Sequence, residues 1–354
     1  KNNLKMKSQL AALVLMLTTT FLFAQKTVVI PFTTFYGSAD AYYKYDFSKI
    51  DNSLTSFTYS HDSFELGMAS IEASHKMDKG SIFVDLGFGN RAAQFTYNDG
   101  VKTFIIKQLN FTYKFSDKFK VTLGSFATHV GYELVDAVDN KNYSMSYAFT
   151  YGPFFNTGIK VQYTSNKFSF MAGVSNPTDL KSTIDAGSTQ KTFIGQLAFL
   201  GDTGSAYFNV TSGSSNPSSD ENKTQFDFVG KKKLSKAFSL GFNGTYALTT
   251  NDLDSALDGE WFSLVGYVNF IVKESSSVAY RLEYLDAKQA TDRLGLLTGT
   301  SVIGNTLSLN YKVGNLTIIP EFRFDIASED IFTDSNAAPK GLTAYALLAT
   351  TYSF

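Results

Sequence analysis

The stretch LTAYALLATTYSF, residues 342–354, decides the fold of this chain. On one side of an extended backbone it places small, apolar and aromatic side chains that end in Tyr352 and Phe354. The intervening residues, from Thr343 to Ser353, fall on the other side. Successive side chains of a β-strand leave opposite faces, so this alternation predicts a strand. The strand ends on an aromatic residue at the last position, and earlier strands must pair with it.

The same two-residue alternation recurs along the chain. One face of each segment carries no charge and the other carries polar or charged groups, in residues 81–89, 108–115, 238–248, 306–313 and 316–325. A charge-free face suits lipid, because an arginine or lysine at mid-bilayer costs roughly 2–4 kcal/mol. A soluble β-sandwich would alternate as well, but its strands are usually shorter. The repetition, together with 33 Phe and 20 Tyr, favours a membrane barrel with aromatic girdles.

Short and long connections alternate between these segments. We count seven short turns, near 76–80, 116–118, 164–167, 201–204, 231–237, 273–276 and 314–315. Eight longer polar loops lie near 46–63, 90–103, 129–154, 176–191, 212–224, 249–260, 286–302 and 326–341. This pattern predicts an all-β fold, a transmembrane antiparallel up-and-down β-barrel of about 16 strands. Because residues 64–75 and 191–200 alternate poorly, 14 or 18 strands stay open.

The first 24 residues read as a secretory signal peptide. Three lysines flank the start of an apolar core, Leu10–Phe23, which is too short to span a bilayer as a helix. The alternative is a short buried helix. Residues 25–354 are expected to form a single barrel domain. Without the signal, 28 basic residues face 32 acidic ones, a net charge of −4, which is too mild to indicate nucleic-acid binding.

Six segments are similar to the OmpL-like family of outer-membrane β-barrel porins, and together they sample nearly the whole of residues 25–354. They are GSADAYYKYDF (37–47), SFELGMAS (63–70), VDLGFGNRA (84–92), NYSMSYAFTYGPFFNTGIK (142–160), GVSNPTDLKS (173–182) and IPEFRFD (319–325). The resemblance implies a barrel in the cell outer membrane that passes small solutes. The last strand also resembles the assembly signal of Gram-negative outer-membrane barrels, which implies that the barrel assembly machinery reads Tyr352 and Phe354.

The longest connection, His129–Phe154, is the third of the long loops. In sixteen-stranded porins, which this chain resembles, the third external loop folds into the lumen and narrows it. We therefore expect an acidic and aromatic constriction segment. Its side chains are Glu133, Asp136, Asp139, Lys141, Tyr143 and Tyr147. The alternative is an external loop that shields the rim of the barrel.

A second group of charges lies on the predicted inner face of the late strands. These lumen-wall charges are Arg281, Glu283, Lys312, Glu321, Arg323 and Asp325. Inward charges set the ion preference of a pore through the potential in its lumen. The alternative is a structural, salt-bridged wall, because three bases match three acids. Pro320 lacks the N–H group of a strand residue, so we expect a bulge there.

Catalytic and metal-binding patterns find little support. The three histidines, His61, His75 and His129, stand in no recognisable metal or nucleophile motif, and we expect neither a metal nor another cofactor. A remote alternative is an outer-membrane hydrolase in which a serine joins His129 at the rim.

The sequence therefore favours a porin that gives passive diffusion of small hydrophilic solutes or ions through a water-filled barrel. A structural or interaction barrel in an outer-membrane secretion or surface-protein complex is the alternative, with a filled lumen. The expected partners are the lipid bilayer, the barrel assembly machinery and small hydrophilic solutes, and no nucleic acid. The oligomeric state is left open, and a homotrimer is possible because porins of this size are often trimeric.

Overall fold

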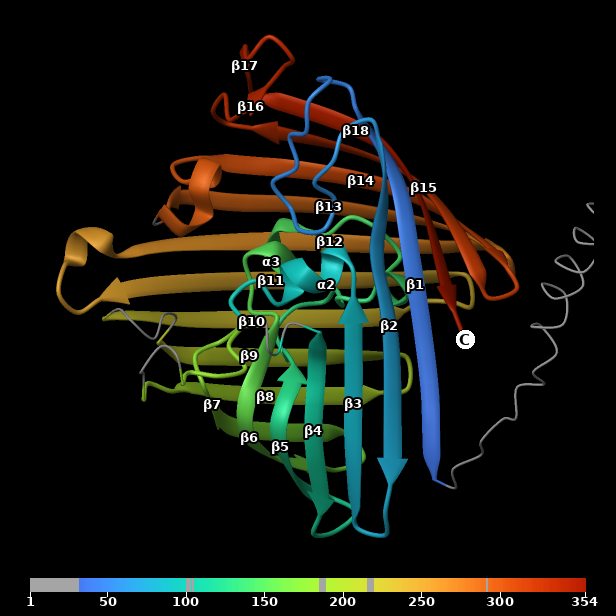
Figure 1. Ribbon diagram of the computed structural model, residues 1–354, viewed down its shortest axis with the longest axis vertical. Coiled ribbons are helices and arrows are strands. Elements are labelled where there is room, and N and C mark those ends of the chain that lie inside the picture. Colours follow the sequence, from blue (N-terminus) through green and yellow to red (C-terminus); the bar gives the residue numbers. More distant parts are fainter. Residues whose placement is uncertain (1–31, 100–102, 104, 185–188, 215–219, 291) are drawn as a thin grey trace, which may run out of the picture. The chain divides into compact units, whose positions relative to one another are not determined.

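The computed structural model describes residues 32–354, apart from 100–102, 104, 185–188, 215–219 and 291. The predicted signal peptide, residues 1–24, lies outside the described residues. Sixteen strands close into one antiparallel barrel, in which each strand neighbours the strand before and after it in the chain (Figure 1). The first barrel strand, β1, pairs with the last, β18. The predicted up-and-down barrel is confirmed, with 16 strands rather than 14 or 18.

The elements follow one another with few interruptions. The barrel strands are β1 (Thr33–Asp46), β2 (Ser63–Lys76), β3 (Gly80–Phe88), β4 (Ile106–Lys114), β5 (Phe119–Ala127), β6 (Phe155–Thr164), β7 (Phe168–Ser175), β8 (Thr192–Gly201), β9 (Gly204–Ser214), β10 (Glu221–Lys233), β11 (Phe238–Asn251), β12 (Gly259–Lys273), β13 (Ser276–Gln289), β14 (Ser301–Val313), β15 (Leu316–Ala327) and β18 (Leu342–Ser353). The long connections hold the helices α2 (Asn90–Phe95) and α3 (Tyr147–Thr150), the 3-10 turns η1 (Ala137–Asp139), η2 (Ser255–Leu257) and η3 (Asp292–Leu297), and the hairpin β16 (Phe332–Thr333) with β17 (Pro339–Lys340). None of the helices in the described part of the chain has the length and apolar character needed to cross a membrane.

The connections divide between the two ends of the barrel as the sequence predicts. Tight turns, such as Asp202–Thr203 and Gly314–Asn315, gather at one end, which we call the short-turn end. The long loops, among them residues 47–62 and 128–154, gather at the other, the long-loop end. Up-and-down strands of even number produce this division, because consecutive connections lie at opposite ends.

The terminal stretch closes the barrel between two strands. β18 pairs with β1 from Ser38↔Ser353 to Asp46↔Tyr345, and with β15 from Leu316↔Tyr352 to Ile326↔Leu342. The last residue joins this seam, because the amide of Phe354 donates to the carbonyl of Gly37 over 2.9 Å. A Cβ atom on Gly37 would lie 2.2 Å from the Phe354 ring, so a larger residue there would displace that ring.

The two faces of the terminal strand differ in exposure as the alternation predicts. Leu348 is 51% exposed and Phe354 67%, whereas the neighbouring Leu347 is 3% exposed and Thr351 3%. Large apolar side chains are exposed on the outer wall of other strands too, for example Phe111, Phe170, Phe208, Leu282 and Leu307. This outer face suits contact with lipid chains, because it carries apolar groups where water would disfavour them.

Pro320 produces no bulge, so that expectation is wrong. The β14–β15 pairing runs from Ser308↔Glu321 to Tyr311↔Ile318 without a change of register, and the two rungs between them are left out. On its other side Pro320 pairs with Leu348 in an unbroken ladder. A shift of one residue would turn every following side chain to the wrong face, so the strand loses a rung and keeps its register.

Candidate functional site in the barrel lumen

The connection between β5 and β6, residues 129–154, lies inside the barrel, and we call it the lumen loop. Near its start the amide of Gly131 donates to Asp227 of β10 over 3.1 Å. Further on, Asp136 Oδ2 lies 2.6 Å from the ammonium of Lys107 on β4. Because β10 and β4 stand far apart in the strand order, the loop crosses the lumen rather than covering the rim from outside. Its helix α3 packs against β11, β12 and β13 (Figure 1).

A buried charge cluster joins the lumen loop to the wall. Arg281 Nη1 lies 2.7 Å from Glu133 of the loop, and its Nε lies 3.1 Å from Glu283. Arg323 lies 3.2 Å from the same Glu283 and 2.9 Å from Asp325. Both arginine side chains are at most 1% exposed. Buried ion pairs need further hydrogen bonds to offset desolvation, and removal of one partner is costly.

The two arginines supply those further bonds to the backbone of the loop. Arg281 Nη1 donates to the carbonyl of Ser144 over 2.5 Å, and Arg323 Nη1 donates to the carbonyl of Met145 over 2.7 Å. A guanidinium carries five N–H donors in a rigid fork, so each arginine binds a carboxylate and a carbonyl at once. The wall therefore holds the middle of the lumen loop through its main chain as well as its side chains.

Two tyrosines of the loop complete these contacts. The Tyr147 amide donates to Glu283 over 2.7 Å and its hydroxyl donates to Asp325 over 2.8 Å. The Tyr143 hydroxyl donates to Asp40 of β1 over 2.5 Å. Burial raises the pKa of both phenols well above the usual range, and the adjacent carboxylates add to the rise. Both hydroxyls therefore stay protonated and act as hydrogen-bond donors.

Glu321 is the wall residue that binds the turn of the loop most directly. Its carboxylate accepts hydrogen bonds from the amides of Tyr143 (2.7 Å) and Ser144 (3.1 Å), and from the hydroxyl of Ser308 (2.7 Å). Of the six predicted wall charges, five thus contact the loop or the cluster that holds it. These five are Arg281, Glu283, Glu321, Arg323 and Asp325.

The sixth wall charge, Lys312, lies apart. It is exposed near the short-turn end, where it lines a cavity of 220 Å³ together with Lys141 of the loop. Asp139 is also exposed. The six loop residues therefore divide, because Glu133, Asp136, Tyr143 and Tyr147 are buried in bonds to the wall while Asp139 and Lys141 are not.

Lys107 is a site residue that sequence reasoning missed. Strict alternation places it on the lipid face with Leu109, yet its side chain is 1% exposed and lies in the lumen. A register shift in the β3–β4 pairing, at Asp85 and Leu86, lets it turn inward. There its ammonium lies 3.0 Å from Asp85 and 2.6 Å from Asp136. A lysine on an otherwise apolar face is the signal that could have indicated such a bulge.

Arg91 of α2 was missed as well. It is fully buried, 3.8 Å from Asp40, and its guanidinium stacks 4.8 Å from the Phe57 ring and 4.9 Å from the Tyr143 ring. Its Nη1 donates to the carbonyl of Val135 over 3.3 Å. Arg91 therefore joins the first three long loops inside the lumen. In the sequence it stands in a polar loop, where nothing distinguishes it from a solvated charge.

In the part of the chain that the structure describes, one group of carboxylates has the spacing of a metal site. Oxygen atoms of Glu72, Asp85 and Asp136 lie within 4.8 Å of one another. The ammonium of Lys107 stands among them and makes ion pairs with two of the three. The lysine supplies the positive charge that a cation would otherwise bring, so the group fits a salt-bridge cluster better than a metal centre.

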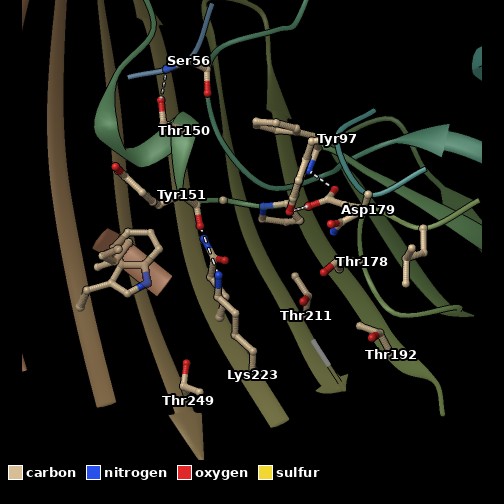
Figure 2. A pocket seen from close by; sticks show the side chains of 18 of the residues that line it. Ser56, Tyr97, Thr150, Tyr151, Thr178, Asp179, Thr192, Thr211, Lys223 and Thr249 are labelled. Carbon is tan, nitrogen blue, oxygen red and sulfur yellow. Dashed lines mark hydrogen bonds between the residues drawn. The ribbon is translucent and has the colours of Figure 1, made fainter. Parts of the chain in front are cut away.

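A cavity of 640 Å³ lies between the lumen loop and the long-loop end, and we call it the vestibule. Figure 2 shows hydroxyl groups of Thr192, Thr211 and Thr249 along its wall. Among the described residues, two charged side chains line it, Asp179 and Lys223. Asp179 accepts hydrogen bonds from the amides of Phe154 (2.6 Å) and Phe155 (3.0 Å), and burial raises its pKa to about 6.

His129 lies in the interior of the barrel beside β9. Its Nε2 stands 3.0 Å from the carbonyl of Val210, and burial lowers the pKa of the imidazole to about 4. The hydrolase alternative expected this side chain at the rim, so that position is wrong. The half-buried ring is therefore neutral near pH 7 and lies within hydrogen-bonding distance of the wall.

Comparisons with known proteins agree with this architecture. Residues 33–354 match a family model described as "Putative beta-barrel porin-2, OmpL-like". No curated protein sequence matches the chain. Among solved structures, an anion-selective porin from Comamonas acidovorans superposes with a TM-score of 0.61 at 10% identity, over 91% of this chain and 99% of that one.

Two further structures share the fold. OmpT of Vibrio cholerae gives a TM-score of 0.59 at 11% identity, over 91% of this chain and 97% of that one. The outer membrane channel DcaP of Acinetobacter baumannii gives 0.57 at 12% identity, again over 91% and 97%. At such low identity these structures establish the barrel fold alone.

Proposed function

The chain belongs to the OmpL-like family of β-barrel porins of the outer membrane, and from this premise we propose that it gives passive diffusion of small hydrophilic solutes or ions across that membrane. In this proposal the lumen loop is the constriction that every solute must pass. The chain acts as a channel without catalysis.

The observation that carries the proposal is that cavities lie on both sides of the lumen loop. The vestibule, of 640 Å³, faces the long-loop end, and the second cavity, of 220 Å³, faces the short-turn end. Each cavity is lined by residues of the loop itself, such as Tyr151 in the first and Lys141 in the second. A loop held across the lumen between two open cavities supports a route that is narrow and limited to small solutes.

The charges that the loop leaves exposed support a pore with little ion preference. Asp139, Lys141 and Lys312 are exposed on the short-turn side, and they are of mixed sign. In the cluster that holds the loop, Arg281, Arg323 and Lys107 pair with carboxylates, so these buried charges contribute little net potential to the lumen.

An interaction barrel is the second candidate, and one observation favours it. Phenylalanines from three long loops pack inside the lumen, with the rings of Phe95 and Phe154 stacked at 5.7 Å and those of Phe149 and Phe154 at 5.2 Å. Phe57 joins them at 5.8 Å from Phe149. A packed lumen would leave the long loops as the working surface of the protein.

Single-channel conductance of the refolded chain in a planar bilayer separates the two candidates. Discrete stable openings are expected, with a reversal potential near zero under a salt gradient. Deletion of residues 136–144 is expected to raise the conductance, because it removes the middle of the constriction. A folded barrel that stays silent in both forms would reject the porin proposal in favour of the interaction barrel. Unchanged conductance on deletion would place the solute route away from the lumen loop.

We also propose a homotrimer. A structure of Vibrio cholerae OmpT is described as a trimer form, and it shares this fold at a TM-score of 0.57 and 11% identity. Light scattering of the detergent-solubilised protein measures the mass of the complex, and a mass of one chain would contradict the proposal.

A further inference from the structure

The vestibule has the size of a ligand site. Its volume of 640 Å³ falls within the range of about 300–1,000 Å³ that is usual for pockets of small molecules. The end of the lumen loop, around Tyr151 and Phe154, forms one side, and residues of the first two long loops, such as Tyr59 and Tyr97, border it as well. A solute that enters from the long-loop end meets this cavity before it meets the constriction.

The charges of the vestibule are engaged by the protein. The carboxylate of Asp179 accepts from two backbone amides and from the hydroxyl of Tyr97, over 3.2 Å in the last case (Figure 2). The ammonium of Lys223 donates to the carbonyl of Tyr151 over 3.2 Å and lies 5.6 Å from the Trp261 ring. Among the described residues that line the cavity, one acid and one base balance, so this lining carries no net charge and suits a neutral ligand.

Aromatic rings form the apolar part of the lining. Tyr151 and Trp261 stand edge to face with centroids 6.5 Å apart, and Tyr97 stands in the same way to Phe154 at 6.1 Å. Tyr97 is 60% exposed and Tyr59 is 47% exposed. Exposed, flat rings that also carry hydroxyls bind ligands that are apolar on one face and polar at the edge.

Hydroxyl groups without partners complete the lining. Thr211 is 5% exposed and Thr249 is 6% exposed, and within the described residues neither hydroxyl makes a hydrogen bond. Both side chains line the cavity at the long-loop ends of β9 and β11 (Figure 2). Neither hydroxyl oxygen is among the buried atoms that lack a partner, so both are open to the cavity and can form hydrogen bonds with a ligand there.

From these features we propose that the vestibule binds a short neutral oligosaccharide before it passes the constriction. The C–H faces of sugar rings pack on the aromatic side chains, and sugar hydroxyls bond to Thr211 and Thr249. The inference deepens the proposed porin function by naming the class of solute. It concerns binding in the vestibule, so it can be measured without transport.

The chain offers a built-in probe, because Trp261 is its one tryptophan and lines the vestibule. Maltotriose is titrated into the refolded full chain in detergent while tryptophan emission is recorded, with isothermal titration calorimetry in parallel. A saturable signal is expected in at least one of the two measurements. The double variant Thr211→Val/Thr249→Val keeps the shape of both side chains and is expected to weaken binding at least fivefold. Thr317→Val, which lines the cavity at the short-turn end, is the matched control and is expected to leave binding unchanged.

The outcomes separate this inference from the porin proposal. Saturable binding by a barrel that does not conduct would support the saccharide site and reject the porin function. Conductance without any maltotriose binding would reject the saccharide site alone. Tighter binding of gluconate than of maltotriose would overturn the inference too, because it would make Lys223 an anion site. Equal affinity of the double variant and the wild type would show that the threonines do not recognise the ligand.

Discussion

Replacement of Glu321 by alanine should release the middle of the lumen loop from the barrel wall. The carboxylate accepts from the amides of Tyr143 and Ser144, and Glu321 makes no ion pair with an arginine among the described residues. Its loss therefore leaves no buried guanidinium uncompensated. Hydrogen bonds to a charged group contribute about 1.5–3 kcal/mol each. Loss of two such bonds destabilises the attached loop by at least about 3 kcal/mol, which raises its released fraction roughly 100-fold.

Hydrogen exchange measures this release directly, because the two amides that bind Glu321 are themselves exchangeable. Peptides that contain Tyr143 and Ser144 should exchange about 100-fold faster in Glu321→Ala, while strand peptides keep their protection. Glu321→Gln retains an acceptor oxygen, so its exchange rate at these amides should fall between those of the wild type and Glu321→Ala. Glu329→Ala removes an exposed carboxylate of the loop that follows β15 and should match the wild type. Unchanged exchange at the two amides in a folded Glu321→Ala barrel would refute the assigned anchoring role.

Three other predictions concern assembly and stability. Phe354→Ala should lower the amount of heat-resistant barrel in isolated outer membranes, whereas Ser353→Ala should not. Equal amounts in the two variants would show that the terminal ring is not recognised during assembly. Burial raises the pKa of Asp179 to about 6, so its folded form binds a proton more readily than its unfolded form. The titration of Asp179 should therefore lower the free energy of unfolding by up to about 3 kcal/mol as the pH rises from 4 to 6. Urea unfolding of wild type and Asp179→Asn across this range checks the sign, and parallel curves would contradict it. Lys107→Met leaves the adjacent carboxylates buried without their counter-charge and should cost about 3–5 kcal/mol, measured as a lower urea midpoint. Lys312→Met, an exposed control, should change that midpoint little, and equal losses in the two variants would count against the buried pairing.

Much of the fold could be predicted because strand geometry imposes a two-residue pattern of polarity on the local sequence. Alternation along 342–354 placed Leu348 and Phe354 on one side of the strand and Leu347 on the other, and the structure exposes the first two and buries the third. The same period assigned Arg281 and Arg323 to the lumen before any partner was known. In a strand, odd-numbered and even-numbered positions point to opposite faces, and this alternation can be read directly from the sequence.

The errors have the same physical origin. Lys107 lies inside because a bulge changes parity at one point, and that bulge depends on how β3 pairs with β4. Pro320 was expected to bulge and does not, because the ladders on both sides of β15 hold its register. Both outcomes follow from neighbouring strands, which the sequence of one strand does not contain.

The sequence by itself predicted the barrel, a strand number of about 16, the two kinds of connection and most of the residues that face the lumen. These properties follow from the two-residue period and from the polarity of each segment, which are local. Only the tertiary structure decided that Arg281 meets Glu133 across 148 positions of the chain and that Arg91 binds three loops together. It also decided that a cavity lined by Thr211 and Thr249 lies on the long-loop side of the lumen loop. Such contacts depend on the closure of the ring, because closure brings strands from its opposite sides within reach of one loop.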